Sequence, residues 1–225
     1  MPRQLGRKAA SGDIAAGLLP LADYFRLSET FERLGRFGIA VRGPAHSVLL
    51  CSRLPIRQLD GAVIAVTEDT STTAVLLRLL LERRYHVTPK AYRRGAHPDA
   101  DARLVIGDEA LKFQHTNTLY PFEIDLAFEW WLWQHTPFVF AVWAARKDLP
   151  IEEKKHLELS LSGALGMNTQ RLEAIAQEAS GPLGLPAEEL HGYLKRFIYR
   201  LSQPEEEGIQ RFHEFVDTYG LLECE

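Results

Sequence analysis

A turn rich in hydroxyl side chains is the first segment of this sequence that could bind a ligand. It lies between an apolar segment and a leucine-rich one, and its hydroxyl groups belong to Thr67, Thr70, Ser71, Thr72 and Thr73. The first N–H groups of a helix have no partner within the helix, and the helix dipole favours negative charge there. Ser71, Thr72 and Thr73 are therefore candidates to bind the carboxylate of a small organic anion, although ordinary N-capping would need only one of them. The turn has no lysine and no Gly-x-x-x-x-Gly-Lys spacing, which excludes a nucleotide phosphate loop.

Two further candidate sites lie at the ends of predicted strands. Gly107 and Asp108 follow the strand predicted at 103–106, and ligands of open α/β sheets bind outside the carboxyl ends of strands. Gly107 would let a ligand approach the backbone, and Asp108 would either contact the ligand or cap the next helix. Ser47, at the start of the apolar segment 47–52, could line the same cleft or satisfy the end of a strand.

The sequence gives little support for nucleophilic or metal catalysis. There is no Gly-x-Ser-x-Gly motif, neither Cys51 nor Cys224 has a histidine beside it in the sequence, and the eight histidines form no metal-ligand spacing. We therefore predict no metal site. His135 could act as a general base, but a surface histidine is the simpler interpretation. Asp125 and Glu129, one helical turn apart, are more typical of a solvated edge.

Composition and charge exclude several classes of protein. The 225 residues are 46% hydrophobic and 25% charged, with a formal charge of −4 that argues against a nucleic-acid partner. The longest apolar run, within 137–145, is far shorter than the roughly 20 residues that span a bilayer. The basic N-terminus lacks the apolar stretch of a secretory signal, and the cysteines have no redox spacing. We expect a cytoplasmic protein with a small-molecule partner, without nucleic acid or membrane.

The periodicity predicts an α/β fold with two lobes, mixed sheets and a helical C-terminal region. Strands are expected at 14–21, 37–41, 47–52, 61–66, 103–106 and 138–143, and a polar helical segment is expected up to about residue 34. The last third reads as helices at 151–165, 168–180, 186–202 and 204–219. Residues 1–58 with 136–225 are assigned to the first lobe and 59–135 to the second, with the apolar segments 47–52 and 138–143 as the crossings.

The segment 125–143 contains all four tryptophans and changes periodicity at Pro137. Before the proline, Leu126, Trp130 and Trp133 have the spacing of one helix face, and Asp125 is placed to act at the helix N-terminus. After the proline, 138–143 has the composition of a strand buried on both faces. Its aromatic residues would belong to the core or to a wall beside a cleft.

Three motifs in a fixed order resemble one known family. They are Val66–Arg78, Leu104–Leu111 and Asp125–Ala144, of which Pro-Phe-Val-Phe-Ala-Val-Trp is the most specific part. They resemble the chorismate dehydratase family of the futalosine route to menaquinone. The 1,4-dihydroxy-6-naphthoate synthase of the same pathway is less similar, because it usually has a Leu/Gly-rich segment after the proline.

The resemblance implies a fold like that of type II periplasmic binding proteins and an activity. Family members convert chorismate to 3-[(1-carboxyvinyl)oxy]benzoate by loss of water, without metal or organic cofactor, and the proton is thought to pass to the substrate's own enolpyruvyl carboxylate. The matched substrate-binding positions are Ser47, Ser71, Thr72, Thr73, Gly107 and Asp108. Thr73 and Asp108 are the catalytic candidates.

The sequence departs from the family pattern in two places. Family members usually begin with a strand and a Tyr-Leu-Asn loop whose asparagine helps to form the site, and this chain opens beyond that element. We expect either a shortened chain or the loss of part of one lobe, with an uncovered sheet edge as the consequence. Gln134, His135 and Thr136 replace the usual Thr-Gly-Leu, and Ala127 replaces a glycine.

Two alternative functions stay open. A non-catalytic binding protein of the same fold would bind a small carboxylate, and the naphthoate synthase reaction would use a different substrate of the same pathway.

Overall fold

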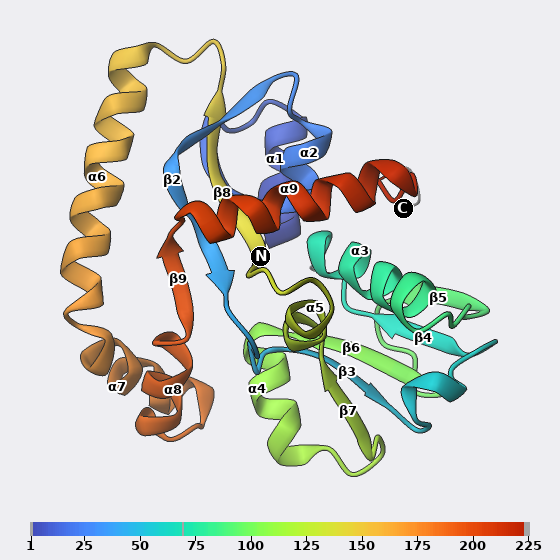
Figure 1. Ribbon diagram of the computed structural model, residues 1–225. Coiled ribbons are helices and arrows are strands. Elements are labelled where there is room, and N and C mark those ends of the chain that lie inside the picture. The colour runs from blue at the N-terminus through green and yellow to red at the C-terminus, as the bar shows by residue number, and fades with distance from the viewer. Residues whose placement is uncertain (1, 69, 223–225) are drawn as a thin grey trace.

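The chain folds around two β-sheets that are flanked by helices (Figure 1). The computed structural model describes residues 2–68 and 70–222. The first sheet has the order β1-β8-β2-β9 and contains β1 (Ala16–Pro20), β8 (Phe138–Arg146), β2 (Phe31–Val41) and β9 (Phe197–Arg200). The second has the order β5-β4-β6-β3-β7 and contains β5 (Ala91–Arg94), β4 (Val63–Val66), β6 (Ala102–Ile106), β3 (Val48–Ser52) and β7 (Phe122–Asp125).

Strand directions confirm the predicted mixed sheet. In the second sheet β4 runs parallel to β5 and β6, whereas β3 is antiparallel to β6 and β7. The pairs of the first sheet are antiparallel, and β1 pairs there only with β8, which leaves it as an edge strand.

Nine α-helices lie in the described part of the chain, and four of them form most of its last third, which was predicted to be helical. They are α1 (Pro2–Ala10), α2 (Leu21–Arg26), α3 (Thr72–Leu79), α4 (Gly107–Thr116), α5 (Leu126–Gln134), α6 (Ile151–Thr169), α7 (Leu172–Leu183), α8 (Ala187–Leu194) and α9 (Gln203–Thr218). A short 3-10 turn covers Ile56–Gln58, and a π-helical turn, Leu80–Arg84, continues α3. No helix within residues 2–68 and 70–222 combines the length and apolarity needed to cross a membrane.

The chain changes sheet at two short segments, 42–47 and 135–137. β3 pairs with β6 and β7 in the second sheet, and β8 lies entirely in the first. Each change therefore falls just before a segment that we expected to be a crossing. The lobe boundaries 1–58 with 136–225 and 59–135 stay a prediction. The pairing of β3 with β6 and β7 places this strand in the second sheet, although its residues were assigned to the first lobe.

Two helix predictions were wrong at their C-terminal ends. The helix expected over 186–202 ends at Leu194, and β9 follows and pairs with β2. Phe197, Ile198 and Tyr199 are aromatic or β-branched, so a free sheet edge is a better partner for them than a helix surface. Likewise α2 ends at Arg26, and β2 begins at Phe31 within a segment that was expected to be helical.

The tryptophan-rich segment forms the predicted helix before Pro137 and the predicted strand after it. Leu126 and Trp130 are fully buried, and Trp133 packs against the same core. Trp130 makes edge-to-face contacts with Phe138 and Phe212, with ring centroids 5.5 and 5.8 Å apart. These aromatic pairs join α5 to β8 and α9, so the core interpretation holds for Trp130.

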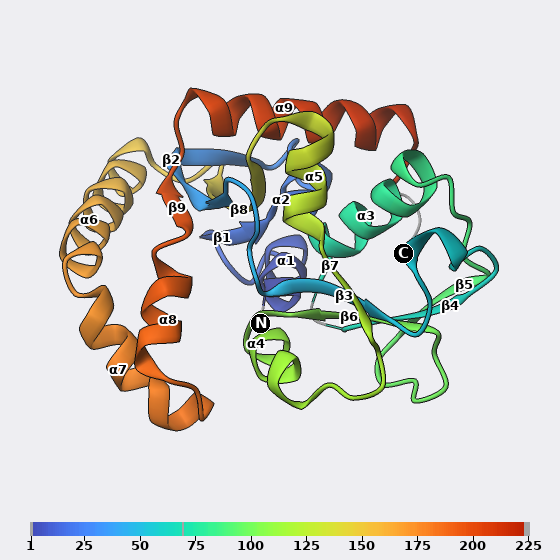
Figure 2. The same ribbon diagram turned by 60° about the horizontal axis from the view of Figure 1, so that its bottom comes forward.

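Helix α9 lies across both lobes (Figure 2). Gly208 lets it approach the segment before β8, because a Cβ there would lie 2.2 Å from the Pro137 carbonyl oxygen. Beyond the helix, Leu221 is buried in the main core, and the Leu222 carbonyl accepts hydrogen bonds from Arg26. The end of the described chain is thus held by the main core and by Arg26 of α2.

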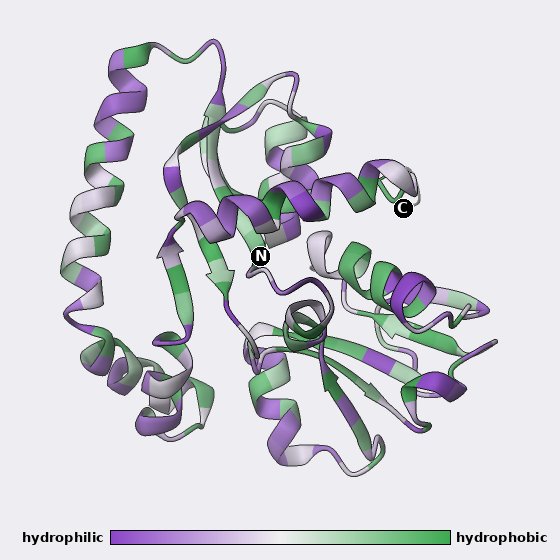
Figure 3. Cartoon of the chain, viewed as in Figure 1, coloured by the Kyte–Doolittle hydropathy of each residue, from purple (hydrophilic) through white to green (hydrophobic). Residues whose placement is uncertain are grey.

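Helix α6 contributes little to the core. Its surface is mixed in hydropathy (Figure 3), and Lys154 is its one buried residue, bonded to Glu32 at 2.6 Å. Between α6, α7 and the first sheet lies an apolar cavity of about 300 Å³, lined by Phe37, Trp143 and Leu165 among others. Trp143 therefore lines a cavity on one side of β8, contrary to the expectation of a strand buried on both faces.

Replacing His135 with glycine is expected to raise the free energy of unfolding by about 0.5–1 kcal/mol. His135 follows α5 in the left-handed conformation, with φ of 56°, and stands where the family resemblance expects glycine. A side chain at such a φ costs energy that glycine avoids. Urea denaturation would measure the change, with Gln177→Gly in the middle of α7 as the control that should lose stability. A less stable His135→Gly protein would contradict the prediction.

Candidate functional site

A cavity of about 380 Å³ lies between the two sheets, where several predicted site residues meet. Its polar side is formed by Ser47, Thr70, Ser71, Thr72, Thr73 and Tyr193. Its apolar side is formed by Leu5, Leu18, Ile39, Ile106, Phe140 and Phe197. A volume of this size is within the range of about 300–1,000 Å³ that is typical of small-molecule sites.

The sheet topology explains why residues far apart in the sequence converge here. Thr70 and Ser71 follow the carboxyl end of β4, and Gly107 follows the carboxyl end of the neighbouring, parallel β6. Ser47 precedes β3, which is antiparallel to β6, so it lies at the same end. The cavity therefore occupies the position where open α/β sheets bind ligands.

The predicted site residues differ in how they are placed. Ser47, Ser71, Thr72, Thr73 and Gly107 line the cavity, and the four hydroxyl residues are at most 5% exposed. Asp108 is exposed on the first turn of α4 and is not part of the cavity lining. Their binding and catalytic roles stay predictions.

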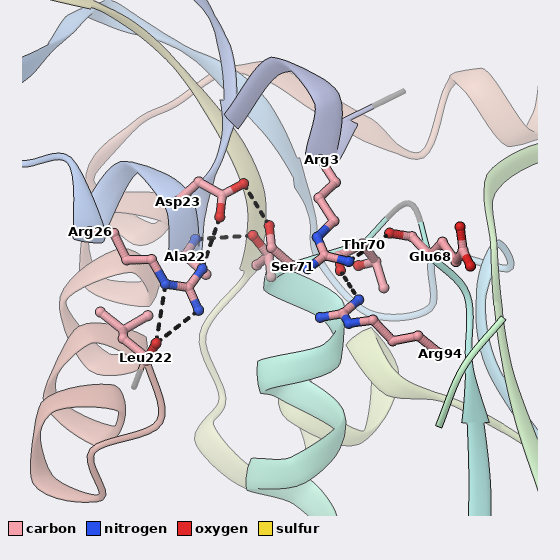
Figure 4. A network of polar contacts seen from close by, with 10 residues as sticks. Arg3, Ala22, Asp23, Arg26, Glu68, Thr70, Ser71, Arg94 and Leu222 are labelled. Carbon is pink, nitrogen blue, oxygen red and sulfur yellow. Dashed lines mark hydrogen bonds and ion pairs between the residues drawn. The ribbon is translucent and has the colours of Figure 1, made fainter. Parts of the chain in front are cut away.

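Two hydroxyls at the start of α3 connect the lobes (Figure 4). Ser71 donates to Asp23 Oδ2 at 2.9 Å, and Thr72 Oγ1 accepts the Ala22 N–H at 3.0 Å. Ser71 is the N-cap residue, yet its side chain makes no capping bond. The hydroxyl-rich turn therefore does more than cap a helix. Thr73 is the residue of the predicted trio whose hydroxyl has no partner among the described residues, and it lines the cavity.

Arginines from both lobes hold the turn before α3 (Figure 4). Arg3 of α1 donates to the Glu68 carbonyl at 3.3 Å, and Arg94 at the end of β5 donates to the Thr70 carbonyl at 3.1 Å. Both bonds are to backbone oxygens, so they constrain the path of the turn itself. The N-terminus of α3 is thereby kept directed at the cavity.

The second polar part of the cavity is built around Ser47. Its carbonyl accepts the Gly107 N–H at 2.8 Å, and its side-chain oxygen accepts a hydrogen bond from the Tyr193 hydroxyl at 3.0 Å. Gly107 has a φ of 57°, and the place of a Cβ there is open space. The glycine is thus required by its backbone conformation, and it leaves room beside the start of α4.

The cavity is electrically neutral at its surface but has two favourable places for negative charge. No described lining residue is an aspartate, glutamate, lysine, arginine or histidine. Helices α3 and α4 both begin at the cavity, at Thr72 and Gly107. Their dipoles and first N–H groups, with the neighbouring hydroxyls, suit a ligand with two anionic ends.

Sequence reasoning missed two residues of this arrangement. Tyr193 was placed inside a long helix, and it lies 146 positions from Ser47, the residue it contacts. Asp23 gave no signal because it is one acidic residue in a short polar helix. A contact of this kind has no spacing that a single sequence can show.

Replacing Thr73 with valine is expected to weaken carboxylate binding about tenfold with little change in stability, because one free donor is lost. Thr72→Val should instead lower the free energy of unfolding by about 1–3 kcal/mol, since it leaves the buried Ala22 N–H unpaired. Calorimetric titration and urea denaturation of both variants would separate the effects. Equal affinity of Thr73→Val and the unchanged protein would count against the anion role of the turn.

The two sheets with a cavity between them define a two-lobed protein of the periplasmic-binding-protein-like fold. A solved protein of Archaeoglobus fulgidus has a TM-score of 0.75 at 18% identity, covering 98% of this chain and 85% of that one. The periplasmic aliphatic sulphonate binding protein of Escherichia coli has a TM-score of 0.64 at 13% identity, covering 98% and 80%. The alkanesulfonate-binding protein of Xanthomonas axonopodis pv. citri, bound to MOPS, has a TM-score of 0.67 at 16% identity, covering 98% and 81%. These likenesses show the fold, as predicted.

Sequence comparison is more specific. A family model described as "Menaquinone biosynthesis" matches residues 1–218. The chain is also 30% identical over 232 residues to the chorismate dehydratase of Thermus thermophilus, covering 95% of this chain and 84% of that protein. The chain belongs to this menaquinone biosynthesis family, and the predicted family resemblance is confirmed.

Proposed function

We propose that this protein is a chorismate dehydratase, which eliminates water from chorismate to give 3-[(1-carboxyvinyl)oxy]benzoate. The observation that carries the proposal is the neutral cavity with two separate groups of hydrogen-bond donors, in a chain 30% identical to a chorismate dehydratase. Chorismate has two carboxylates, so each donor group has one to bind. Membership of the menaquinone biosynthesis family supports the same assignment.

Binding would use the starts of α3 and α4. Thr73 and the first N–H groups of α3 would hold one carboxylate, and Ser47 with the start of α4 would hold the other. Phe140 and Ile39, from β8 and β2, would contact the ring and exclude water. Fixing the substrate in one orientation in a dry site is the main contribution the enzyme has to make.

The reaction breaks one C–H and one C–O bond and forms an aromatic ring. The electron pair of the C–H bond enters the ring, and the hydroxyl leaves as water with a proton. Aromatisation supplies the driving force. Because no described side chain in the lining is a strong base, proton removal would use the substrate's own enolpyruvyl carboxylate, as the resemblance implies, with the lining hydroxyls guiding it.

Purified protein incubated with chorismate should release the enolpyruvyl benzoate, which chromatography would resolve from chorismate. Folded protein that returns chorismate unchanged would overturn the proposal. Parallel incubation with cyclic de-hypoxanthine futalosine tests the naphthoate synthase reaction, which predicts turnover of that substrate instead.

A non-catalytic carboxylate-binding protein is the second candidate. It is favoured by the sulfonate-binding proteins among the fold neighbours, one of them solved with MOPS bound. Calorimetry showing tight binding of chorismate without product would favour this alternative. The cytoplasmic location predicted from the sequence stays a prediction in either case.

A further inference from the structure

The hairpin of α7 and α8 joins the two halves of the molecule beside the cavity. Leu111 of α4 packs in one cluster with Ala176, Leu185 and Leu190 of this hairpin. Helix α8 leads into β9, which belongs to the first sheet, whereas α4 follows β6 of the second. The hairpin therefore packs against α4 on the side of the second sheet and continues along the chain into the first sheet.

Tyr193, near the end of α8, extends from this hairpin into the cavity. Its hydroxyl donates to Ser47 Oγ at 3.0 Å, and its ring packs edge-to-face on Phe197 at 5.0 Å. Phe197 and Tyr193 both line the cavity. The ring is thus fixed by packing, and the hydroxyl is fixed by its bond to Ser47.

The hydrogen bond from Tyr193 restricts the direction in which the Ser47 hydroxyl can donate its proton. A serine hydroxyl has one proton to donate and a rotatable O–H bond. When the oxygen accepts from Tyr193 and the side chain is 2% exposed, the remaining direction for the proton is toward other acceptors in the cavity. Ser47 then becomes an oriented donor instead of a freely rotating one.

The surroundings of Tyr193 keep it in the donating form. Burial raises the pKa of Tyr193 above its usual value of 10, the hydrogen bond to Ser47 lowers it, and the nearby Asp108 carboxylate raises it. The phenol is therefore protonated at neutral pH. Asp108 is exposed and absent from the lining, and its charge acts on Tyr193 without a hydrogen bond between the two side chains.

We propose that Tyr193 is a positioning residue that orients the Ser47 hydroxyl as a hydrogen-bond donor to an anionic or leaving oxygen of the bound ligand. This proposal rests on the proposed function for the identity of its substrate. The test of the proposal does not depend on the proposed function, because any aromatic ligand with two carboxylates can report the orientation of the Ser47 hydroxyl.

The test is a double-mutant cycle of Tyr193→Phe and Ser47→Ala, with Tyr199→Phe as the matched control. Tyr199 is another partly buried tyrosine of the same region, but it donates to the Leu194 carbonyl and lies outside the cavity lining. Tyr193→Phe should lower kcat/KM for chorismate about tenfold, mostly in kcat, as for one lost orienting hydrogen bond. In the Ser47→Ala background the same change should have no further effect.

Binding of isophthalate, measured by calorimetry, separates this proposal from the proposed function. Tyr193→Phe should raise the Kd for isophthalate about threefold, and Ser47→Ala should abolish the difference. Coupling seen with isophthalate in a protein that does not turn over chorismate would overturn the dehydratase assignment and support Tyr193. Additive effects of the two changes, or equal effects of Tyr193→Phe and Tyr199→Phe, would overturn the role of Tyr193. A protein that neither binds isophthalate nor turns over chorismate would overturn both.

Discussion

Replacing Ser47 with alanine is expected to lower kcat/KM for chorismate about 10²–10³-fold. In a cavity without charged lining residues, each hydroxyl donor carries a large share of the stabilisation of developing negative charge. The Ser47 side chain is buried, and bonds from Gly107 and Tyr193 fix its position, so no solvent molecule replaces its hydroxyl in the same geometry. Steady-state kinetics with chorismate would measure the loss.

Ser52→Ala is the matched control for this prediction. Ser52 is a buried serine at the other end of β3, and its hydroxyl donates to the Leu54 carbonyl at 2.6 Å, away from the cavity. Its replacement should lower stability but leave kcat/KM within about twofold, since Ser52 is not among the residues that line the cavity. If Ser47→Ala retained activity comparable to that of Ser52→Ala, the assignment of Ser47 to the substrate site would be wrong.

Replacing Asp125 with alanine is expected to lower the free energy of unfolding by about 3–5 kcal/mol, a large part of the stability of a domain. Asp125 Oδ1 accepts the N–H groups of Ala127 and Phe128 at 2.9 and 3.0 Å, which makes it the N-cap of α5. Its other oxygen accepts the His46 N–H at 2.6 Å, in the segment where the chain changes sheet. The change would leave all three N–H groups without their acceptor. Urea denaturation and thermal melting would both show the loss.

Asp125→Asn is the informative comparison because it keeps one oxygen acceptor and should recover much of the lost stability. Burial raises the pKa of Asp125 above its usual 3.8, although bonds from backbone N–H groups oppose the shift. The native state therefore holds its proton at a pH where the unfolded chain has released it. The contribution of this carboxyl to stability is greatest at acid pH and falls as the pH rises through the native pKa. Asp125→Asn should remove that part of the pH dependence.

A surface carboxylate provides the control for Asp125. Asp148 forms an exposed ion pair with Arg146, and ion pairs on the surface contribute little to the free energy of unfolding. Asp148→Ala should leave the denaturation midpoint unchanged. A shift as large as that of Asp125→Ala would show that the loss reflects general charge effects and not the cap.

The parts of the site that could be predicted depend on local chemistry. Hydroxyls before a helix and glycine after a strand indicate ligand-binding ends of α/β units, and Ser47, Thr73 and Gly107 indeed line one cavity. Asp108 has the same local signal, yet the first turn of α4 directs it outward. Local sequence predicts the end of an element well but not which side of it a residue occupies.

The sequence by itself determined the features that arise from short-range periodicity and capping. The buried face of α5, its Asp125 cap and the strand after Pro137 follow from side-chain spacing and backbone chemistry within a few residues. The motifs in order along the chain were also sufficient to indicate the family, which the comparisons confirm.

Only the tertiary structure decided which distant groups meet. Ser71 contacts Asp23, and Tyr193 contacts Ser47, across 48 and 146 positions of the chain. The segment 197–200 became a strand because the edge of β2 was available to it, which no local preference reveals. Contacts of this kind form because folding buries the two lobes against each other and must satisfy the polar groups enclosed between them. Their partners are chosen by that packing and not by spacing along the sequence.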